Sequence, residues 1–378
     1  MQLTVKTLAG LEPLLASELE ALGAQQIEAG RRVVRAEGDR RLLYRANLEL
    51  RTALRVLVPI AEFEAASEQD LYRAVQQVDW GRYLGSSHTL AVDAVTSGQV
   101  FRHSRYAALK TKDALVDQFR SRSGRRPSVD VQDPTLRINL RIKDTQCTLS
   151  LDSSGDSLHR RGYRSRGGPA PLNEVLAAGM LLLAGYTGQR TLLDPMCGSG
   201  TILAEAAMIA CRRPPQWQRT RFGFLRWRDA DLQLWEEVRE RAGQAMQQPE
   251  ALLFGRDRHP RAIALSRSNL GKAGLLRYAS LEAADFLQAP PPAPEGLLLM
   301  NPPYDERMPQ DEVESFYQQI GDRLKQAYTG WEAWVLSGHR EALKRIGLRA
   351  SKRTSLYNGP LACKYLKYEL YVGSKKRS

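Results

Sequence analysis

The segment LLLMNPPYDERM at residues 297–308 places an amide, two prolines and an aromatic ring directly after an apolar run. Because consecutive prolines fix φ and remove backbone donors, the side-chain oxygen of Asn301 and the carbonyl of Pro302 can be fixed acceptors. Two such acceptors suit one exocyclic NH2 group of a nucleobase, and holding that nitrogen in place is catalysis by positioning. Tyr304 offers a ring on which an extruded base stacks. The alternative is an ordinary turn, because Asn-Pro commonly ends a strand.

A glycine loop, LLDPMCGSGT at residues 192–201, is the second candidate for chemistry. Gly198 and Gly200 permit a tight turn, and the following helix directs free N–H groups at a ligand. Leu203 stands where a dinucleotide fingerprint needs its third glycine, and the Lys-Ser/Thr pair of a P-loop is missing. Asp194 would repel a pyrophosphate but suits the ammonium of an amino-acid-like cofactor. The loop therefore favours S-adenosylmethionine over NAD or ATP.

Two further carboxylates end the next predicted strands. Asp257 can accept hydrogen bonds from ribose hydroxyls, although its interval from the glycine loop exceeds the usual spacing of about 20 residues. The extra segment, residues 211–238, holds three tryptophans among many arginines. It either covers the sheet with apolar side chains or contacts RNA. Asp285 either accepts from an adenine amino group or caps a helix.

The pattern of elements changes along the chain. From residue 172 onward strand-like and helix-like segments alternate, which predicts a mainly parallel, doubly wound α/β sheet. Residues 348–360 and 361–373 look like two strands joined by an Asn-Gly turn. Residues 1–155 instead predict α+β modules built on antiparallel sheets, with a hairpin that turns near 143–145.

Composition points to a polyanionic partner. The chain has 378 residues, a formal net charge of +13 and a pI near 9.7. Residues 101–170 carry 15 basic and 7 acidic side chains, which is the electrostatic footprint of nucleic acid or a solvated basic surface. Four scattered cysteines and five histidines show no ligand spacing, so we expect no metal site and a cytoplasmic location. No apolar run reaches the roughly 18 residues of a membrane span.

Clustered Arg and Lys residues are the typical phosphate contacts. The predicted RNA-binding residues are Arg102, Arg105, Lys110 and Lys112 in a basic helix, and Arg160, Arg161, Arg164 and Arg166 in a segment rich in Gly, Pro and Arg. The alternative is a solvated surface, because Arg is abundant throughout the chain.

A family resemblance rests on these motifs. DPMCGSGT together with NPPY resembles methyltransferases that modify exocyclic nitrogens of bases. Residues 45–155, with RYAALKTKDALVDQFR, look like a THUMP domain with its ferredoxin-like partner. The string SLDSSGDSLHRRGYR, followed by APLNEVLAA, is similar to THUMP-domain 23S rRNA guanine-N2 methyltransferases, the group of RlmL, the amino-terminal half of YcbY and YpsC-like proteins. The resemblance covers nearly the whole chain.

The resemblance implies a Rossmann-like S-adenosylmethionine-dependent methyltransferase domain at 172–378. Before it the resemblance implies a ferredoxin-like part at 1–50 completed by flanking segments, a THUMP RNA-binding domain at 51–155 and a linker at 156–171. It implies that the catalytic residues are Asn301, Pro302 and Tyr304, and that the cofactor contacts Asn173, Asp194, Pro195, Cys197, Gly198, Gly200, Asp257, Asp285 and Asn301. Cys197 and Met196 depart from the common loop sequence, and we interpret Cys197 as a buried filler rather than a nucleophile.

The implied reaction is direct methyl transfer to N2 of a flipped-out guanosine in 23S rRNA or its large-subunit precursor, by a monomer without membrane or DNA partners. Two alternatives stay open. One is a THUMP-type tRNA guanine-N2 methyltransferase with the same catalytic motifs. The other is a non-catalytic RNA-binding factor in ribosome assembly.

Overall fold

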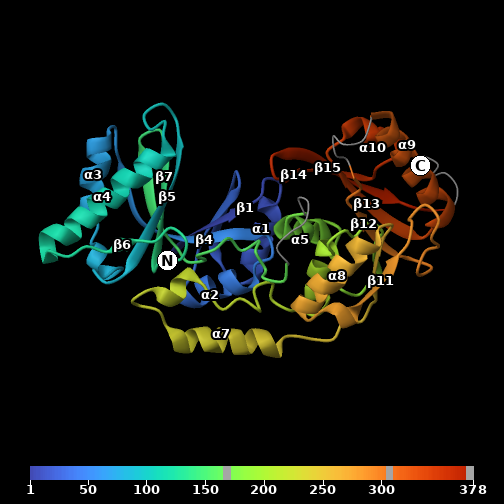
Figure 1. The fold of residues 1–378 in the computed structure, drawn as a ribbon, viewed down its shortest axis with the longest axis horizontal. Coiled ribbons are helices and arrows are strands. Elements are labelled where there is room, and N and C mark those ends of the chain that lie inside the picture. Colours follow the sequence, from blue (N-terminus) through green and yellow to red (C-terminus); the bar gives the residue numbers. More distant parts are fainter. Residues whose placement is uncertain (165–171, 304–309, 372–378) are drawn as a thin grey trace. The chain divides into compact units, whose positions relative to one another are not determined.

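A computed structural model describes residues 1–164, 172–303 and 310–371 (Figure 1). The chain divides into two units, and each is built from separate stretches of sequence. Unit 1 contains Met1–Thr7, Ala16–Leu158 and Arg219–Glu240. Unit 2 contains Leu8–Leu15, His159–Gln218 and Arg241–Ser378.

Unit 1 is built on an eight-stranded sheet with the order β2-β3-β1-β4-β8-β7-β5-β6. Its strands are β1 (Gln2–Thr7), β2 (Gln25–Gly30), β3 (Val33–Glu37), β4 (Ala53–Glu64), β5 (Thr89–Ser97), β6 (Ser128–Val129), β7 (Leu136–Lys143) and β8 (Gln146–Asp152). The long strand β4 pairs with β1 near its start and with β8 from Leu57 onward. One strand therefore joins the two predicted α+β modules into one continuous sheet.

The predicted hairpin near 143–145 is confirmed, because β7 and β8 pair antiparallel up to Lys143 and Gln146. The expectation of purely antiparallel modules is wrong for β5, which pairs in parallel with both β6 and β7. The reason is α4 (Ser104–Ser123), a helical crossover that returns the chain to the end of the sheet where β5 began.

The helices of unit 1 cover apolar faces of this sheet. They are α1 (Glu12–Ala21), which the division between the units crosses, α2 (Arg40–Glu49), α3 (Glu68–Gln77), α4 and the short 3-10 helix η1 (Trp80–Arg82). Ser67 caps α3, since its side chain accepts a hydrogen bond from the Asp70 amide. Leu71, Leu115 and Ile138 belong to the buried core between α3, α4 and the sheet.

Arg219–Glu240, which we call the insertion, is the part of unit 1 that comes from the second half of the sequence. It contains the 3-10 helix η2 (Gly223–Arg226) and most of α7 (Leu232–Gln244). Phe224 stacks on Tyr44 of α2 with ring centroids 4.4 Å apart. Gly223 lies so close to the end of β8 that an added Cβ would be 2.3 Å from the Asp152 carbonyl oxygen. The insertion thus packs on α2 and on the end of β8, whereas residues 211–218 of the tryptophan-rich extra segment belong to unit 2.

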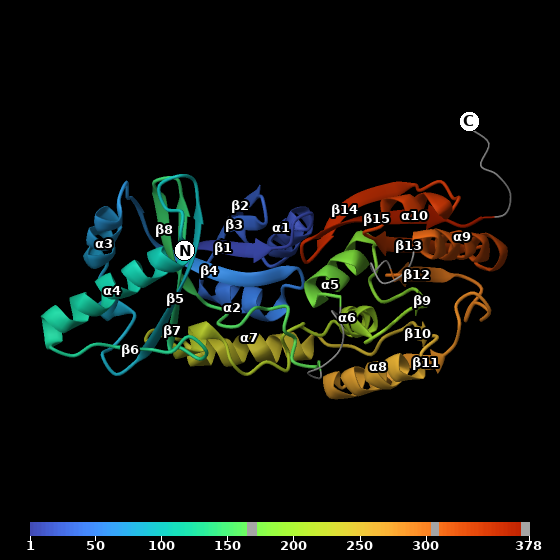
Figure 2. The ribbon, with the colours of Figure 1, turned by 45° about the horizontal axis from the view of Figure 1, so that its top comes forward.

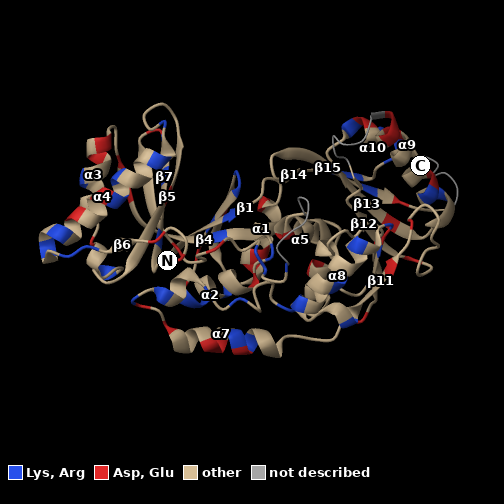
Figure 3. Cartoon of the chain, in the orientation of Figure 1, with Lys and Arg blue, Asp and Glu red and all other residues tan. Residues whose placement is uncertain are grey.

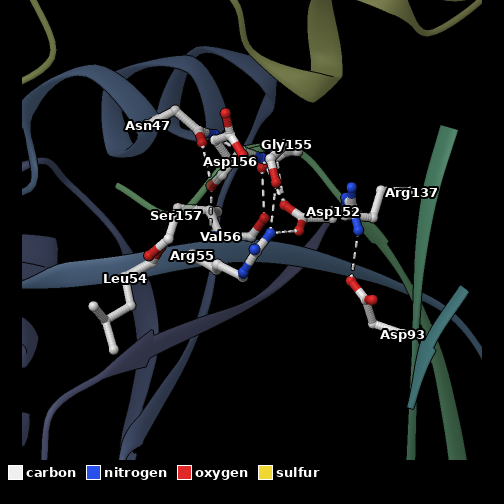
Figure 4. Close-up of polar contacts among 12 residues, drawn as sticks. Asn47, Leu54, Arg55, Val56, Asp93, Arg137, Asp152, Gly155, Asp156 and Ser157 are labelled. Atoms are coloured by element: carbon white, nitrogen blue, oxygen red, sulfur yellow. Dashed lines mark hydrogen bonds and ion pairs between the residues drawn. The ribbon is translucent and has the colours of Figure 1, made fainter. Parts of the chain in front are cut away.

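Figure 4 shows the polar network at the end of β8. The buried Asp152 carboxylate pairs with Arg55 of β4 and accepts from the Ser154 and Gly155 amides at 2.9 and 3.0 Å. Asn47 of α2 donates to the Ser153 hydroxyl and accepts from the Ser154 hydroxyl at 2.9 and 2.7 Å. These bonds satisfy the polar groups where the chain leaves the sheet beneath the insertion.

Unit 2 is built on a seven-stranded sheet with the order β11-β10-β9-β12-β13-β15-β14. Its strands are β9 (Leu192–Asp194), β10 (Leu253–Asp257), β11 (Ala279–Ala283), β12 (Gly296–Met300), β13 (Trp331–Ser337), β14 (Lys352–Asn358) and β15 (Leu361–Glu369). The first five are parallel, as predicted, and β14 and β15 form the predicted antiparallel hairpin. The order of the strands reverses between β9 and β12, where open α/β sheets bind ligands.

Helices form two layers around this sheet (Figure 2). One layer holds α5 (Glu174–Leu183), α6 (Thr201–Ala210) and α8 (Pro260–Ala273), with η3 (Leu276–Tyr278) after it, and the other holds α9 (Gln310–Ala327) and α10 (Arg340–Arg345). Tyr317 and Leu324 of α9 pack on Leu298 and Met300 of β12. Within the described part of the chain, no helix combines the length and apolarity that crossing a bilayer requires.

Candidate active site

A cavity of about 870 Å³ opens at the carboxyl edge of the parallel strands in unit 2. Residues at the ends of β9, β10 and β12 line it: Asp194 and Asp257 are the last residues of β9 and β10, and Asn301 follows β12. These strands meet at one edge because they are parallel and adjacent. The structure therefore brings the glycine loop, Asp257 and residues 301–303 to one site, and the volume falls in the range of small-molecule sites, about 300–1,000 Å³.

The glycine loop is held from two sides. The Cys197 amide donates to the Arg256 carbonyl at 2.8 Å, and the Gly198 amide donates to the Asp257 carboxylate at 3.1 Å. The Gly198 carbonyl accepts from the Ser266 hydroxyl of α8 at 2.8 Å. Gly200 has a φ of 76°, which favours glycine, and an added Cβ would be 3.0 Å from the Ser266 hydroxyl. The part of the cavity wall that the glycine loop forms is therefore shaped by backbone atoms rather than by side chains.

Asp194 is 2% exposed and lines the cavity. Its carboxylate accepts from the Met196 amide at 3.3 Å, and no ion pair to it exists among the described residues. Burial raises the pKa of Asp194 to about 8, with a smaller contribution from the nearby Asp257 charge. A buried carboxylate without a cation is chemically suited to a cationic ligand group that reaches it through the cavity.

Asp257 and Asp285 serve the local fold as well as the cavity. The second oxygen of Asp257 accepts from the His259 amide at 2.9 Å, so this carboxylate joins the glycine loop to the start of α8. Asp285 accepts from the Leu287 amide at 2.9 Å and also lines the cavity. The alternative that Asp285 caps a helix is wrong, because the residues after it form a turn and the described chain between β11 and β12 contains no helix.

Asn301 follows the fully buried strand β12 and lines the cavity. Its side-chain oxygen is buried and has no hydrogen-bond partner among the described residues. Such an oxygen is costly unless a ligand donates to it. Pro302 is buried and Pro303 lines the cavity, so the turn is rigid. Tyr304 and Arg166 lie outside the described residues.

Cys197 is 6% exposed, and burial is the main reason its thiol pKa lies above the ordinary value. A thiol held neutral is a poor nucleophile. Pro195 also lines the cavity, whereas Asn173 does not. The Asn173 side-chain oxygen accepts from the Val175 and Leu176 amides and so caps α5. That Asn173 also reaches the cofactor or substrate stays a prediction.

Arg164 lines the cavity, a location that the sequence did not indicate. It forms an ion pair with Glu174 at 3.2 Å and donates to the Thr201 hydroxyl at the start of α6 at 2.7 Å. Burial raises the pKa of Glu174 to about 7, and the Arg164 charge opposes that shift. Arg164 therefore stabilises the start of α6, the helix that follows the glycine loop. A single Arg in an Arg-rich segment gives no sequence signal for this role.

The other predicted RNA-binding residues differ in exposure. Arg102, Arg105 and Arg160 are exposed, whereas Lys110 and Lys112 are half-buried. Figure 3 shows that α4 carries acidic as well as basic side chains. Arg161 is 1% exposed and pairs with Glu205 of α6 at 3.2 Å. The predicted phosphate contact of Arg161 is thus corrected, because its guanidinium is inside unit 2.

The donor set of the cavity fits S-adenosylmethionine. Among the described residues, the Asp194 carboxylate without an ion pair, the glycine loop and the Asp257 carboxylate lie around one space. Within the described residues no group of three or more His, Cys, Asp or Glu side chains is arranged to hold a metal ion.

Comparison with protein families gives three matches. Residues 161–367 match the RMKL-like methyltransferase domain, residues 65–152 the THUMP domain and residues 2–57 the RlmL ferredoxin-like domain. The chain belongs to the RMKL-like methyltransferase family. The predicted fold class is confirmed: an α/β methyltransferase domain follows a ferredoxin-like and THUMP region.

Curated relatives of this RMKL-like methyltransferase are named as RNA methyltransferases. A ribosomal RNA large subunit methyltransferase K/L of Syntrophotalea carbinolica is 46% identical over 375 residues, which are 96% of this chain and 52% of that protein. A putative RNA methyltransferase of Synechocystis is 44% identical over 96% of this chain and 95% of its own length. The chain thus spans about half the length of the K/L relatives.

Solved structures share the whole fold. A possible methylase from Clostridium difficile has a TM-score of 0.90 at 28% identity, and each chain is covered to 99%. A putative methyltransferase crystallised with SAH has a TM-score of 0.89 at 26% identity, also with 99% of each chain covered. TrmN from Thermus thermophilus, at 21% identity and a TM-score of 0.73, shares the fold.

Proposed function

We propose that this protein methylates the exocyclic N2 of a guanosine in 23S rRNA or its large-subunit precursor, with S-adenosylmethionine as methyl donor. The observation that carries the proposal is Asn301, which lines the cavity and whose buried side-chain oxygen has no hydrogen-bond partner among the described residues. An exocyclic amine carries two N–H donors, and one of them can donate a hydrogen bond to this oxygen.

The cofactor assignment is supported by the residues around the cavity. Asp194 would accept a hydrogen bond from the ammonium group of S-adenosylmethionine, and the backbone of the glycine loop would lie against the cofactor. Asp257 would accept from the ribose hydroxyls and Asp285 from the adenine amino group. The relative crystallised with SAH supports the same assignment. When bound, S-adenosylmethionine supplies an electrophilic methyl group.

The protein's own contribution is orientation. Asn301 and the Pro302 carbonyl accept both amine hydrogens, which turns the nitrogen lone pair toward the cavity. No residue has to remove a proton first, because the amine becomes acidic only as the new bond forms. We also propose that Tyr304 stacks on the extruded base.

The rRNA substrate is supported by the K/L relatives and by the THUMP domain that precedes the catalytic domain. The domain borders at 1–50, 51–155, 156–171 and 172–378, the monomeric state and the cytoplasmic location remain part of the proposal. A tRNA substrate is the alternative that uses the same chemistry.

The test is methylation in vitro with labelled S-adenosylmethionine. Purified protein is incubated with unmodified 23S rRNA and, separately, with unmodified tRNA, and the nucleosides are then separated. We expect label in N2-methylguanosine from 23S rRNA alone. Label from tRNA alone would keep the chemistry and overturn the substrate, and cofactor binding without label in either RNA would favour a non-catalytic assembly factor.

A further inference from the structure

The β14–β15 hairpin extends past the same sheet edge as Asn301. β12 and β13 are parallel, with Met300 opposite Val335, so both strands end at the cavity edge. β15 runs antiparallel to β13 and pairs Lys364 with Ser337, the last residue of β13. The turn between Asn358 and Leu361 therefore lies beyond the end of β13, on the catalytic side.

Two large apolar side chains are exposed at this tip. Tyr357 is 40% exposed and Leu361 is 43% exposed. An added Cβ at Gly338 would be 2.6 Å from Leu361, so the tip packs on the backbone that follows β13. Leu356 is fully buried on the other side of β14, which directs Tyr357 away from the core. The hairpin thus holds an aromatic ring at the rim of the catalytic edge.

The face that carries Tyr357 is basic. Alternation along β14 places Arg353 and Ser355 on the same side as Tyr357, and pairing places Lys364 opposite Ser355. The Lys364 ammonium donates to the Ser355 hydroxyl at 2.8 Å. Of the seven Lys or Arg residues between Glu341 and Glu369, Lys344, Arg345 and Lys367 are paired with glutamates. Arg353 and Lys364 are the cations that alternation and pairing place on this face. An exposed ring on a strand face that also carries cations is an arrangement by which proteins bind single-stranded nucleic acid.

We propose that the hairpin tip binds the RNA strand next to the target nucleotide, with Tyr357 stacked on an unpaired base and Arg353 and Lys364 against its phosphates. The strand spacing of about 4.8 Å and the rise of about 3.3 Å per residue put Tyr357 roughly 17 Å from Asn301. At that separation Tyr357 cannot stack on the base that Asn301 binds, but it can reach a nucleotide a few positions away. The inference rests on the proposed function. It adds a second contact with the RNA, one that requires an unpaired base near the target nucleotide.

The first test compares Tyr357→Ala with the wild-type chain on an unmodified 23S rRNA transcript. Loss of one stacking contact should raise the KM for RNA and the filter-binding Kd about 5- to 150-fold. The Kd for S-adenosylmethionine and the unfolding midpoint should stay unchanged, because the ring is exposed and distant from the cavity. Tyr357→Phe keeps the ring and should behave as wild type.

Tyr371→Ala is the matched control. Tyr371 is 47% exposed and follows β15 at the opposite edge, where Glu369 pairs with Glu332 at the start of β13. Its removal should leave the KM for RNA unchanged. A second variant, Arg353→Gln, should weaken binding and lower the slope of log Kd against log salt by about one unit.

The outcomes separate this inference from the function on which it rests. Wild-type KM in Tyr357→Ala, or an equal loss in Tyr357→Phe, overturns the stacking contact while methylation by the wild type stands. If the wild type methylates no RNA and yet its filter binding weakens in Tyr357→Ala alone, the contact stands and the proposed reaction fails.

Discussion

The Gly198 amide donates to the Asp257 carboxylate at 3.1 Å, although 59 residues separate them in the sequence. The glycine loop and Asp257, which we propose contact the amino-acid end and the ribose of the cofactor, are therefore one hydrogen-bonded assembly. The same carboxylate also holds the first turn of α8 through His259. A change at Asp257 would disturb the glycine loop as well as the proposed ribose contact, and the two effects could not be separated. The predictions below therefore concern other residues.

Asn301→Ala should abolish most methyl transfer with a much smaller loss of cofactor binding. Removing one fixed polar partner of a reacting group costs about 10²- to 10³-fold in kcat, whereas Asn301 is only one of several predicted cofactor contacts. Single-turnover rates and calorimetric Kd values for S-adenosylmethionine measure the two effects. Asn301→Asp keeps an acceptor oxygen and should retain more activity than Asn301→Ala. A fall of less than threefold in Asn301→Ala would remove this residue from the mechanism.

Cofactor affinity should depend on pH through Asp194. Burial raises the pKa of this carboxyl to about 8 in the free protein, so it is mostly protonated at neutral pH. A protonated carboxyl has to lose its proton before it accepts from an ammonium, so the Kd for S-adenosylmethionine should fall as pH rises from about 6 to 8, by up to tenfold per unit. Calorimetry in two buffers should record release of a proton below the pKa.

Asp194→Asn is the control for that pH dependence. It should bind the cofactor more weakly and with little change between pH 6 and 8, because no proton has to leave. Methylthioadenosine, which lacks the amino-acid end, should bind both proteins without this slope. The same slope in Asp194→Asn and the wild type would show that another group titrates.

Arg161 should be essential for stability rather than for RNA binding. Its ion pair with Glu205 is almost fully buried, with side-chain exposures of 1% and 0%. Arg161→Met would leave the Glu205 charge without this partner, at a cost of about 3–5 kcal/mol in the free energy of unfolding, measured by urea denaturation. Arg161→Met with Glu205→Leu should cost less than the single change. A stable single variant with weakened RNA binding would restore the phosphate-contact hypothesis.

The insertion should be required for the stability of unit 1. Phe224 is fully buried and stacks on Tyr44, so Phe224→Ala should lower the free energy of unfolding by about 3–5 kcal/mol. Hydrogen exchange should locate the weakening in α2 and the end of β8. Leu232→Ala is the control on the same segment, because Leu232 is 58% exposed and should change stability by less than about 0.5 kcal/mol. Faster exchange confined to unit 2 would contradict the assignment.

Local patterns carried the prediction of the site. Asp194 and Asp257 are the last residues of β9 and β10, and Asn301 directly follows β12, and parallel strands of one sheet bring such positions together. The hairpin at the C-terminal end was predictable for the same reason, since the Asn-Gly turn lies within the segment it joins.

Long-range pairings were not predictable from such patterns. The parallel pairing of β5 with β7 depends on where α4 packs, and the sequence of either strand is equally suited to an antiparallel neighbour. The insertion packs on α2, about 180 residues earlier in the chain, through aromatic contacts that leave no periodic signal. The burial of Arg161 depends on Glu205, and nothing near Arg161 in the sequence distinguishes it from the exposed Arg160.

The most direct test of the central claim is mass spectrometry of nucleosides from 23S rRNA and from tRNA, in cells with and without the gene for this protein. The account predicts that N2-methylguanosine is lost from 23S rRNA at one position, and that the gene for Asn301→Ala does not restore it. An unchanged N2-methylguanosine content in 23S rRNA would contradict the account, whether or not the tRNA fraction changes.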